Sequence, residues 1–297
     1  MRPMLITGAD GQVGFELRRS LVSLGDVVAC NRAELDLEKE GDILASLEAI
    51  RPAVIFNAAA YTAVDRAEED VARAIAVNGM APGVMARWAA DNDCVLIHYS
   101  TDYVFDGTKD SAYVETDDTN PRSVYGKSKL QGEEAVRAAA GRHLILRTSW
   151  VYSHHGHNFL KTILRLAGER ETLRIVADQV GAPTSAALIA DASAYIVEKI
   201  LSKQNAGSGI YHLTAQGSAS WYDYACHIVD NATQRGFGGL LPVHKIEPIA
   251  TSDYPTPAMR PLNSRLNCAK LMDCFDLQLS PWQDGVEKVI SQIAVAN

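Results

Sequence analysis

The sequence predicts an α/β protein with a doubly wound parallel sheet, followed by a smaller C-terminal α/β lobe. Short apolar runs alternate with helical patterns as far as Ser149, which is typical of parallel sheets with helices on both faces. The 297 residues, 47% hydrophobic and 22% charged, suffice for one large or two modest globular domains. We expect the first domain to span 1–150, with segments around 185–215 returning to it. The smaller lobe is expected to take up most of 151–297.

Charge and cysteine content narrow the classes of partner. The formal net charge of −8 argues against a nucleic-acid surface, so an anionic ligand must be small and held locally. The five cysteines form no C-x-x-C pair, which is typical of reduced thiols in a cytoplasmic protein. Met1 leads directly into a strand-like run, and the sequence has no apolar run long enough to span a bilayer. We therefore expect a cytoplasmic protein without a signal peptide, a membrane partner or a nucleic-acid partner.

The first strand and the turn after it carry a dinucleotide-binding pattern. Met4–Thr7 is apolar and runs into Gly8-Ala-Asp-Gly-Gln-Val-Gly14, and the helix that follows has one apolar stripe and ends at Gly25. Such glycines allow a tight turn, a close approach to a pyrophosphate and close helix–strand packing, while the helix N-terminus binds the phosphates. A purely structural turn is the alternative. The pattern predicts a Rossmann-type fold with cofactor contacts at Gly8, Gly11, Gln12, Val13 and Gly14.

The end of the second strand, Val27–Cys30, bears on the choice of cofactor. An acidic residue there favours NAD, whereas an arginine favours NADP, and this chain has Asn31 and Arg32. Arg32 therefore favours NADPH, with NADH also usable; a solvated arginine that pairs with Glu34 is the alternative. The residues that follow are expected to flank the adenine ring, namely Asp36 and Leu37.

Small residues follow the third strand, 53–57, and would let a cofactor lie close to the backbone. The stretch beyond them is alanine-rich and predicted to be helical through Trp88. Within it, the Asn78 amide is expected to brace the backbone beneath the site, although a solvated asparagine is equally compatible with the pattern. The predicted cofactor contacts in this region are Ala58, Ala59, Ala60 and Thr62.

Three residues suit the reduction of a carbonyl group. Thr101 ends the most apolar strand, and ligands of open α/β sheets bind beyond such strand ends. Tyr125 and Lys129 are four apart and would share one helix face. The ammonium is expected to lower the pKa of Tyr125 and make it a proton donor, while Thr101 holds the carbonyl oxygen. An ordinary surface pair is the alternative for Tyr125 and Lys129. Tyr103 is expected to wall the pocket.

The C-terminal half has a looser pattern. Helices are predicted at 158–168, 185–202, 221–231 and 282–296, and strands at 173–177 and 209–214. The histidines of His154-His-Gly-His157 lack a cysteine or carboxylate at metal-ligand spacing, so we predict a polar loop and no metal ligands. The loop around Arg260 suits a diphosphate, with a surface basic loop as the alternative.

Seven motifs occur in an order that resembles one family: Gly8-Ala-Asp-Gly-Gln-Val-Gly14, Asn57-Ala-Ala-Ala-Tyr-Thr-Ala-Val-Asp65, Ser100-Thr-Asp-Tyr-Val-Phe105, Tyr125-Gly-Lys-Ser-Lys129, Thr148-Ser-Trp-Val-Tyr152, Gly181-Ala-Pro-Thr184 and Arg260-Pro-Leu-Asn-Ser264. The chain resembles the dTDP-4-dehydrorhamnose reductases, extended short-chain dehydrogenase/reductases, over nearly its whole length. The resemblance implies NADPH- or NADH-dependent reduction of the 4-keto group of dTDP-4-dehydro-L-rhamnose. This reaction is the last step of dTDP-rhamnose synthesis for cell-surface polysaccharides such as O-antigen.

The resemblance also implies roles for single residues. Tyr125 would donate the proton, Lys129 would hold the nicotinamide ribose, and Thr101 would orient the keto oxygen. The substrate would be contacted by Thr101, Asp102, Tyr103, Trp150, Asn158 and Arg260. Some family members are described as dimers bridged by Mg²⁺. Glu16 is present here, but Ala187 replaces the expected glutamate. The missing glutamate argues against a dimer bridged by Mg²⁺. The sequence alone leaves undecided whether the protein forms a homodimer and whether it binds Mg²⁺.

Two other functions are alternatives for this sequence pattern. A nucleotide-sugar epimerase or 4,6-dehydratase would share the fold, but a dehydratase commonly has Asp-Glu after the threonine, and this chain has Asp102-Tyr103. A non-catalytic regulatory subunit of the kind that partners methionine adenosyltransferase is the second rival. The complete set of Thr101, Tyr125 and Lys129 argues against it.

Overall fold

A six-stranded parallel sheet organises the larger part of the molecule. The computed structural model describes residues 2–139, 141–202, 207–237 and 242–296. The strand order is β10-β5-β4-β3-β1-β2, and every pairing in this sheet is parallel. The strands are β1 (Met4–Thr7), β2 (Val27–Cys30), β3 (Val54–Asn57), β4 (Val95–Thr101), β5 (His143–Thr148) and β10 (Gly209–His212).

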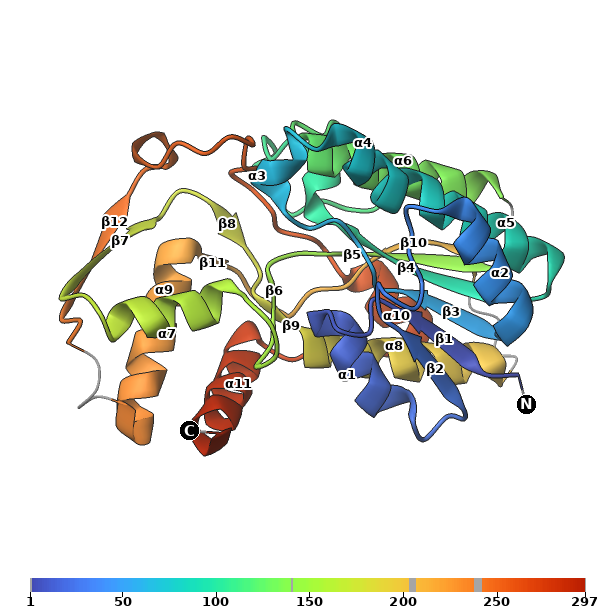
Figure 1. Ribbon diagram of the computed structural model, residues 1–297. Helices are drawn as coiled ribbons and strands as arrows, with labels where there is room; N and C mark the ends of the chain where they lie inside the picture. Colours follow the sequence, from blue (N-terminus) through green and yellow to red (C-terminus); the bar gives the residue numbers. More distant parts are fainter. Residues whose placement is uncertain (1, 140, 203–206, 238–241, 297) are drawn as a thin grey trace.

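Helices cover both faces of the sheet, which confirms the doubly wound prediction (Figure 1). One apolar core joins the strands to three helices, namely α1 (Gln12–Leu21), α8 (Ala186–Leu201) and α10 (Ala269–Phe275). A second core on the opposite face joins them to α2 (Glu40–Ile50), α5 (Ala81–Asp91) and α6 (Val124–Ala138). Helix α1 ends at Leu21, earlier than the predicted end at Gly25.

Polar caps fix the starts of two of these helices. The Ser123 hydroxyl accepts from the Gly126 backbone N–H at 3.1 Å and starts α6 just before Tyr125. Ser185 caps α8 in the same way through the Leu188 N–H at 3.2 Å. A capping hydroxyl satisfies one of the N–H groups that a helix start leaves without a partner. The cap of α6 therefore sets where the side chains of that helix meet the sheet.

The segment between β3 and β4 is more broken than the single helical stretch predicted. It consists of α3 (Val64–Ala67), α4 (Val71–Ala74), a π-helical turn η1 (Ile75–Met80) and then α5. Asn78 lies in the π turn. Its Oδ1 accepts from the Tyr61 N–H at 2.8 Å, and its Nδ2 donates to the Tyr61 carbonyl at 3.0 Å. The predicted bracing role of Asn78 is confirmed.

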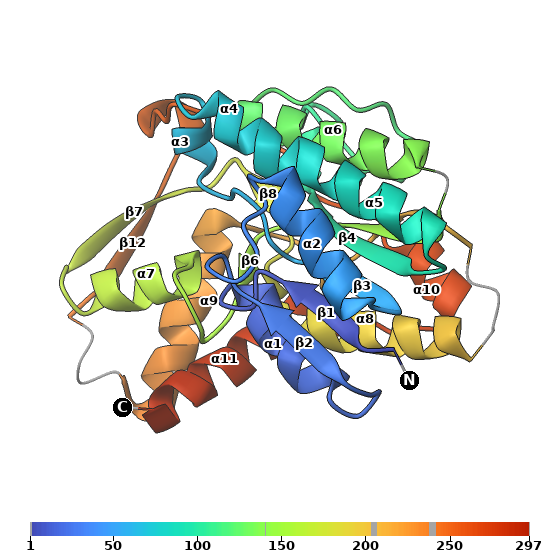
Figure 2. The same ribbon diagram turned by 45° about the vertical axis from the view of Figure 1, so that its right-hand side comes forward.

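A smaller lobe stands beside the sheet domain (Figures 1 and 2). Its core joins three helices, namely α7 (Phe159–Ala167), α9 (Trp221–Ala232) and α11 (Trp282–Ala296). Three short sheets complete it: β7 (Thr172–Val176) with β12 (Lys245–Ile249), β8 (Val180–Gly181) with β11 (Ala219–Ser220), and β6 (Val151–Tyr152) with β9 (Thr184–Ser185). Shorter turns are η2 (Asp102–Val104), η3 (Thr233–Phe237) and η5 (Thr251–Asp253).

The chain passes between the two parts more than once. Helix α8 and strand β10 follow the first lobe segments in sequence, yet they pack on and extend the large sheet. Later, Tyr113 donates its N–H to the Arg265 carbonyl at 2.8 Å, which ties the C-terminal segment to the loop before α6. Within the described ranges, no helix combines the length and apolar character needed to cross a bilayer.

Candidate active site

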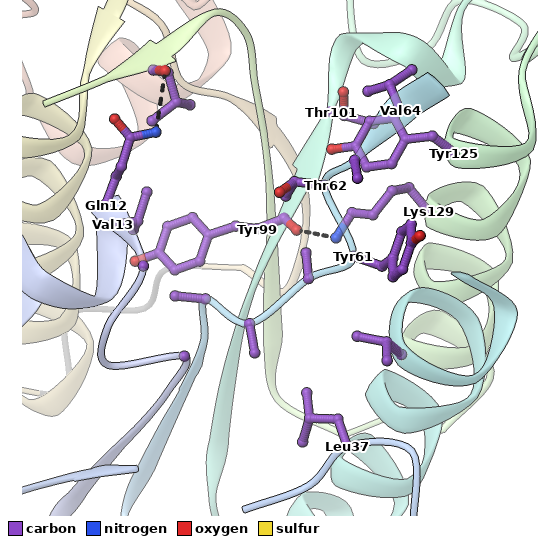
Figure 3. Close-up of a pocket in the computed structure, with 18 of the residues that line it drawn as sticks. Gln12, Val13, Leu37, Tyr61, Thr62, Val64, Tyr99, Thr101, Tyr125 and Lys129 are labelled. Atoms are coloured by element: carbon purple, nitrogen blue, oxygen red, sulfur yellow. Dashed lines mark hydrogen bonds between the residues drawn. The ribbon is translucent and has the colours of Figure 1, made fainter. Parts of the chain in front are cut away.

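One large cavity of about 860 Å³ opens at the carboxyl ends of β1, β3, β4 and β5, where the sheet domain meets the lobe. Figure 3 shows side chains from the N-terminal turn, the β3 and β4 ends and α6 pointing into it. It brings together most of the predicted site residues: Gly8, Gly11, Gln12, Val13, Asn31, Arg32, Asp36, Leu37, Ala58, Ala59, Ala60, Thr62, Thr101, Asp102, Tyr103, Tyr125, Lys129 and Trp150. Three predicted residues do not line it, namely Gly14, Asn158 and Arg260.

The N-terminal glycine turn has the shape of a phosphate cradle. Gly8 has φ +68°, and a Cβ there would lie only 2.7 Å from the Ala59 Cα. A Cβ on Gly14 would collide with the Gly8 carbonyl oxygen. Gly14 therefore serves close packing of α1 onto the turn, while Gly8, Gly11 and Gln12 face the cavity. A glycine-rich turn at a helix N-terminus fits a dinucleotide pyrophosphate.

The hydroxyl groups of Thr101 and Tyr125 lie side by side in the cavity (Figure 3). Thr101 Oγ1 accepts from the Tyr103 N–H at 3.1 Å and donates to Asp102 Oδ1 at 3.0 Å. Removal of the phenol from bulk water raises the pKa of Tyr125, which the hydrogen bond with Thr101 opposes. Tyr125 is therefore protonated at neutral pH. A protonated phenol held beside a fixed hydroxyl can deliver a proton to an oxygen placed between them.

The prediction that Lys129 lowers the pKa of Tyr125 is wrong for this structure. Lys129 is 2% exposed, and its Nζ donates to the backbone carbonyl of Tyr99 at 2.6 Å. Burial lowers the pKa of Lys129 itself to about 8, against the opposing charge of Glu133. The spacing of four residues places both side chains on one face of α6, but it does not reveal how completely the protein removes the Lys129 ammonium from water.

Asp102 carries an unusual carboxyl group beside the two hydroxyls. It is 3% exposed, and its Oδ2 has no hydrogen-bond partner among the described residues. Burial raises the pKa of Asp102 to about 6, and the hydrogen bond from Thr101 opposes the shift. A carboxyl group with this pKa changes its charge near neutral pH, next to the hydroxyl of Thr101.

A buried ion pair holds α6 against the sheet one turn beyond Lys129. Arg147 of β5 donates from Nε and Nη2 to the two carboxylate oxygens of Glu133, at 2.9 and 2.6 Å. Ser100 of β4 donates to the same carboxylate at 2.5 Å. Glu133 and Arg147 are 1% and 2% exposed. The network crosses from helix to two strands and so fixes the height of Lys129 and Tyr125 above the sheet.

Arg32 pairs with a carboxylate other than Glu34, the partner considered as the alternative to a cofactor phosphate. Its Nη2 lies 2.5 Å from Oε1 of Glu38, whereas Glu34 accepts from the Asn31 backbone N–H at 2.9 Å. Glu34 therefore orders the loop after β2 instead of competing for the arginine. Arg32 keeps 66% of its side chain exposed at the edge of the cavity.

Trp150 lies in the cavity wall, on the side of the lobe. Its backbone has φ +49°, and its indole stacks on Trp221 with ring centroids 3.5 Å apart. Gly181 lies so close to this indole that a Cβ on Gly181 would be 2.6 Å from the Trp150 ring. The stack and the glycine fix one rigid aromatic surface opposite the hydroxyl groups.

Asn158 and Arg260 lie outside the cavity lining and have partners of their own. Asn158 caps α7 through the Lys161 N–H at 3.0 Å, and its Nδ2 donates to Gln12 Oε1 at 2.8 Å and to the Ser153 carbonyl at 2.6 Å. Arg260 Nη2 lies 2.6 Å from Asp65 Oδ2, and its Nη1 donates to the Tyr103 hydroxyl at 3.5 Å. Both residues therefore contact side chains or loops of the site, and neither faces the cavity in this structure.

The sequence reasoning missed several lining residues, notably Tyr99, Tyr61, Arg66 and Arg73. Tyr99 lies in β4, reaches the cavity and donates its hydroxyl to Ser193 of α8 at 2.8 Å (Figure 3). In a strand buried on both faces, apolar patterning does not tell which side chain reaches a ligand. The two arginines belong to short helices without any motif, so no sequence pattern indicated that they line the cavity.

The residues considered as metal ligands, in the histidine loop and at Glu16, have other contacts. His155 stacks on Phe15, with centroids 4.3 Å apart, and its Nε2 lies 2.9 Å from the Asp10 carbonyl. Glu16, 4% exposed, pairs with Arg19 at 3.1 Å on α1, the helix that packs against the helix of Ala187. In the part of the chain that the structure describes, no three His, Cys, Asp or Glu side chains are grouped as metal ligands.

The sheet topology and the groups at its strand ends define a class. A Rossmann-type sheet that presents a threonine, a tyrosine and a lysine beside a dinucleotide turn is that of the short-chain dehydrogenase/reductases, which are NAD(P)-dependent oxidoreductases. The family model described as RmlD substrate binding domain matches residues 1–295. The chain belongs to this family, that of the dTDP-4-dehydrorhamnose reductases.

Curated relatives and solved structures agree with this assignment. The dTDP-4-dehydrorhamnose reductase of Burkholderia thailandensis is 49% identical over 288 residues, covering 95% of this chain and 96% of its own length. The reductase of Escherichia coli K12 is 44% identical over 295 residues, with coverage of 98% and 97%. The crystal structure of the Bacillus anthracis reductase in complex with NADP superposes with a TM-score of 0.88 at 32% identity, covering 98% and 99% of the two chains.

Proposed function

We propose that this chain reduces the 4-keto group of dTDP-4-dehydro-L-rhamnose to give dTDP-L-rhamnose, the last step of dTDP-rhamnose synthesis. One observation carries the proposal: the Thr101 and Tyr125 hydroxyls face a single cavity that runs from the glycine turn to the indole of Trp150. The names of relatives at 44–49% identity support the choice of sugar. The reduced cysteines are consistent with a cytoplasmic location.

The chain's own groups manage the proton and the position of the keto oxygen. When bound, the nicotinamide cofactor supplies the hydride. Thr101 orients the keto oxygen by turning its hydroxyl proton from Asp102 to that oxygen, and Tyr125 protonates the same oxygen as it becomes an alkoxide. Lys129 lines the same cavity and holds the nicotinamide ribose when the cofactor is bound. The donor must be protonated before the reaction, and the raised pKa of Tyr125 provides for that.

Residues of the cavity divide between two ligands. The glycine turn, the loop of Arg32, Asp36 and Leu37, and the small residues after β3 hold NADPH, with NADH as a second cofactor. The indole of Trp150 packs against the deoxysugar, with Asp102 and Tyr103 beside it. Residues 1–150, with α8 and β10, form the cofactor domain, and the rest of 151–297 forms mainly the substrate lobe. Arg260 reaches the nucleotide only if its pair with Asp65 opens.

Preference for NADPH depends on Arg32. A guanidinium can bind the 2′-phosphate that NADH lacks. The change Arg32→Ala should therefore raise the dissociation constant of NADPH more than that of NADH. Equal effects on both cofactors would show that Arg32 does not bind the phosphate.

The decisive experiment follows nicotinamide absorbance with purified protein, NADPH and dTDP-4-dehydro-L-rhamnose. We expect stoichiometric oxidation of NADPH, with dTDP-L-rhamnose as the product. An epimerase or a 4,6-dehydratase returns its hydride within one catalytic cycle, so it would not consume free NADPH steadily. A regulatory subunit would bind the cofactor without oxidising it. Either result, with binding shown by titration, would overturn the proposal.

A further inference from the structure

Two arginines from different elements converge on a single carboxylate oxygen at the edge of the cavity. Arg32, in the loop after β2, places Nη2 2.5 Å from Oε1 of Glu38. Arg73, on α4, places Nε 2.8 Å from the same oxygen. All three residues line the cavity. Two guanidinium groups that bind one carboxylate in this way could bind a phosphate in the same arrangement.

The two arginines differ in how firmly they are held. Arg73 is 26% exposed, lies over the ring of Tyr61 with 5.7 Å from its Cζ to the centroid, and has Asp70 4.0 Å away. The hydroxyl of Tyr61 in turn donates to Asp70 at 3.2 Å, so the two neighbours of Arg73 are themselves hydrogen-bonded to each other. Arg32 is 66% exposed, and its only ion pair in the described structure is that with Glu38. Arg73 is thus fixed in place, whereas Arg32 can reorient.

The position of this group relates it to the adenosine part of a dinucleotide. In Rossmann-type sheets the ribose next to adenine lies at the end of the second strand, where an acidic residue binds its 2′-hydroxyl or an arginine binds a 2′-phosphate. Here both kinds of residue are present and bind one another. Glu38 directly follows Asp36 and Leu37, which also line the cavity.

We infer that Glu38 is an internal competitor for the 2′-phosphate and that Arg73 is a second phosphate-binding residue beside Arg32. This inference rests on the proposed nicotinamide cofactor and adds how the chain discriminates between its two forms. With NADPH, the phosphate displaces the carboxylate and takes over both guanidinium groups. With NADH, Glu38 stays between the arginines and accepts a hydrogen bond from the ribose. The balance between carboxylate and phosphate sets the preference.

The test uses two cofactor fragments that differ only in the 2′-phosphate, namely 2′,5′-ADP and 5′-AMP, titrated calorimetrically. Glu38→Gln should bind 2′,5′-ADP about fivefold to tenfold more tightly, since a neutral amide competes less with the phosphate, and 5′-AMP no more tightly. Arg73→Ala should bind 2′,5′-ADP at least about tenfold more weakly and 5′-AMP within about twofold of the wild type. The same changes should shift the ratio of NADH to NADPH dissociation constants in opposite directions.

A matched ion pair provides the controls. Glu40 and Arg87 lie 3.7 Å apart, are more exposed than Glu38 and Arg73, and do not line the cavity. Glu40→Gln and Arg87→Ala make the same charge changes and should leave both fragments unaffected. The inference fails if Glu38→Gln does not favour 2′,5′-ADP over 5′-AMP, or if Arg73→Ala weakens both fragments equally.

The fragments contain neither nicotinamide nor sugar. A protein that shows these shifts but does not reduce the dTDP sugar would retain the inference and lose the proposed reaction. A wild-type protein that binds neither fragment would overturn this inference together with the proposed cofactor.

Discussion

The ammonium nitrogen of Lys129 lies 2.6 Å from the backbone carbonyl oxygen of Tyr99 and donates a hydrogen bond to it. This bond joins α6 to β4 through a side chain of the active site, and both residues line the same cavity. Because the ammonium is buried, its charge is costly, and the pKa of Lys129 falls to about 8. The side chain therefore changes its charge within an accessible pH range.

The stability of the protein should report this titration. The folded-state pKa of Lys129, about 8, lies below its ordinary value of 10.5, so between these pH values the unfolded chain binds more protons. The free energy of unfolding of the wild type should therefore rise relative to Lys129→Met by roughly 3 kcal/mol as pH increases from about 8 to about 10.5. The lost hydrogen bond to Tyr99 adds a constant offset. Urea unfolding of both proteins at several pH values measures this difference in the free energy of unfolding.

Lys127→Met is the control for that experiment, because Lys127 is an exposed lysine on the same helix. Its stability relative to the wild type should not vary with pH over this range. A gap for Lys129→Met that stays constant with pH would show that the buried amine is not the titrating group.

Removal of the Tyr125 hydroxyl should disable turnover without harming cofactor binding. Tyr125→Phe keeps the ring but loses the proton donor, so kcat should fall about 10²–10⁴-fold. The dissociation constant of NADPH, measured by fluorescence titration, should change little. Tyr195→Phe makes the same chemical change away from the cavity, where the hydroxyl donates to the Asp276 carbonyl at 3.4 Å. Activity of Tyr125→Phe equal to that of Tyr195→Phe would remove Tyr125 from the mechanism.

Asp102 should make the protein less stable as the pH rises toward neutrality. Its folded-state pKa of about 6 exceeds the ordinary 3.8, so the folded state binds more protons between these values. Its contribution to stability is complete below about pH 4 and is lost as pH passes 6. Asp102→Asn should gain up to roughly 3 kcal/mol over the wild type between about pH 4 and 7. Denaturant unfolding at matched pH values tests this, with the exposed Asp118→Asn as a control that should show no such gain.

The ion pair of Glu133 and Arg147 should be costly to break. Arg147→Met leaves a buried carboxylate that, among the described residues, keeps Ser100 alone as a side-chain partner, so the free energy of unfolding should fall by about 3–5 kcal/mol. Arg165→Met breaks an exposed pair with Glu169 at 2.7 Å and should cost less than about 1 kcal/mol. Chemical unfolding of both variants gives the comparison. If both variants lost the same free energy of unfolding, burial of the Glu133–Arg147 pair would not make it more costly to break than an exposed pair.

Local patterns in the sequence predicted much of the sheet domain. The run from Met4 to Gly14 encodes a strand, a turn and a helix in consecutive residues, so the strand and the glycine turn lie where they were predicted. The helix predicted at 221–231 is present, and Ser220 begins it in a capping box with Asp223. The amide of Asn78 braces Tyr61 as expected. Each of these features depends mainly on neighbours close in sequence or on one short loop.

Other features depend on contacts between distant parts of the chain. The strands β8, β9 and β11 are two residues long and exist only because distant partners meet, so no periodic signal marks them. Asn158 was predicted to contact the nucleotide, but its side chain caps α7 and binds Gln12. Glu38 and Arg73 are 35 residues apart and belong to no shared motif. Burial of Lys129 likewise follows only from the folded surroundings.

The return of α8 and β10 to the large sheet has a consequence for synthesis on the ribosome. Five of the six strands have been made once residue 148 is complete, but α8 is not finished until Leu201 and β10 not until His212. Until then the nascent chain exposes the apolar face that Ile189, Ile196 and Val197 later cover. Surfaces of this kind are those on which chaperones act. A message truncated before residue 186 would therefore yield a product that aggregates, although its glycine turn is already complete.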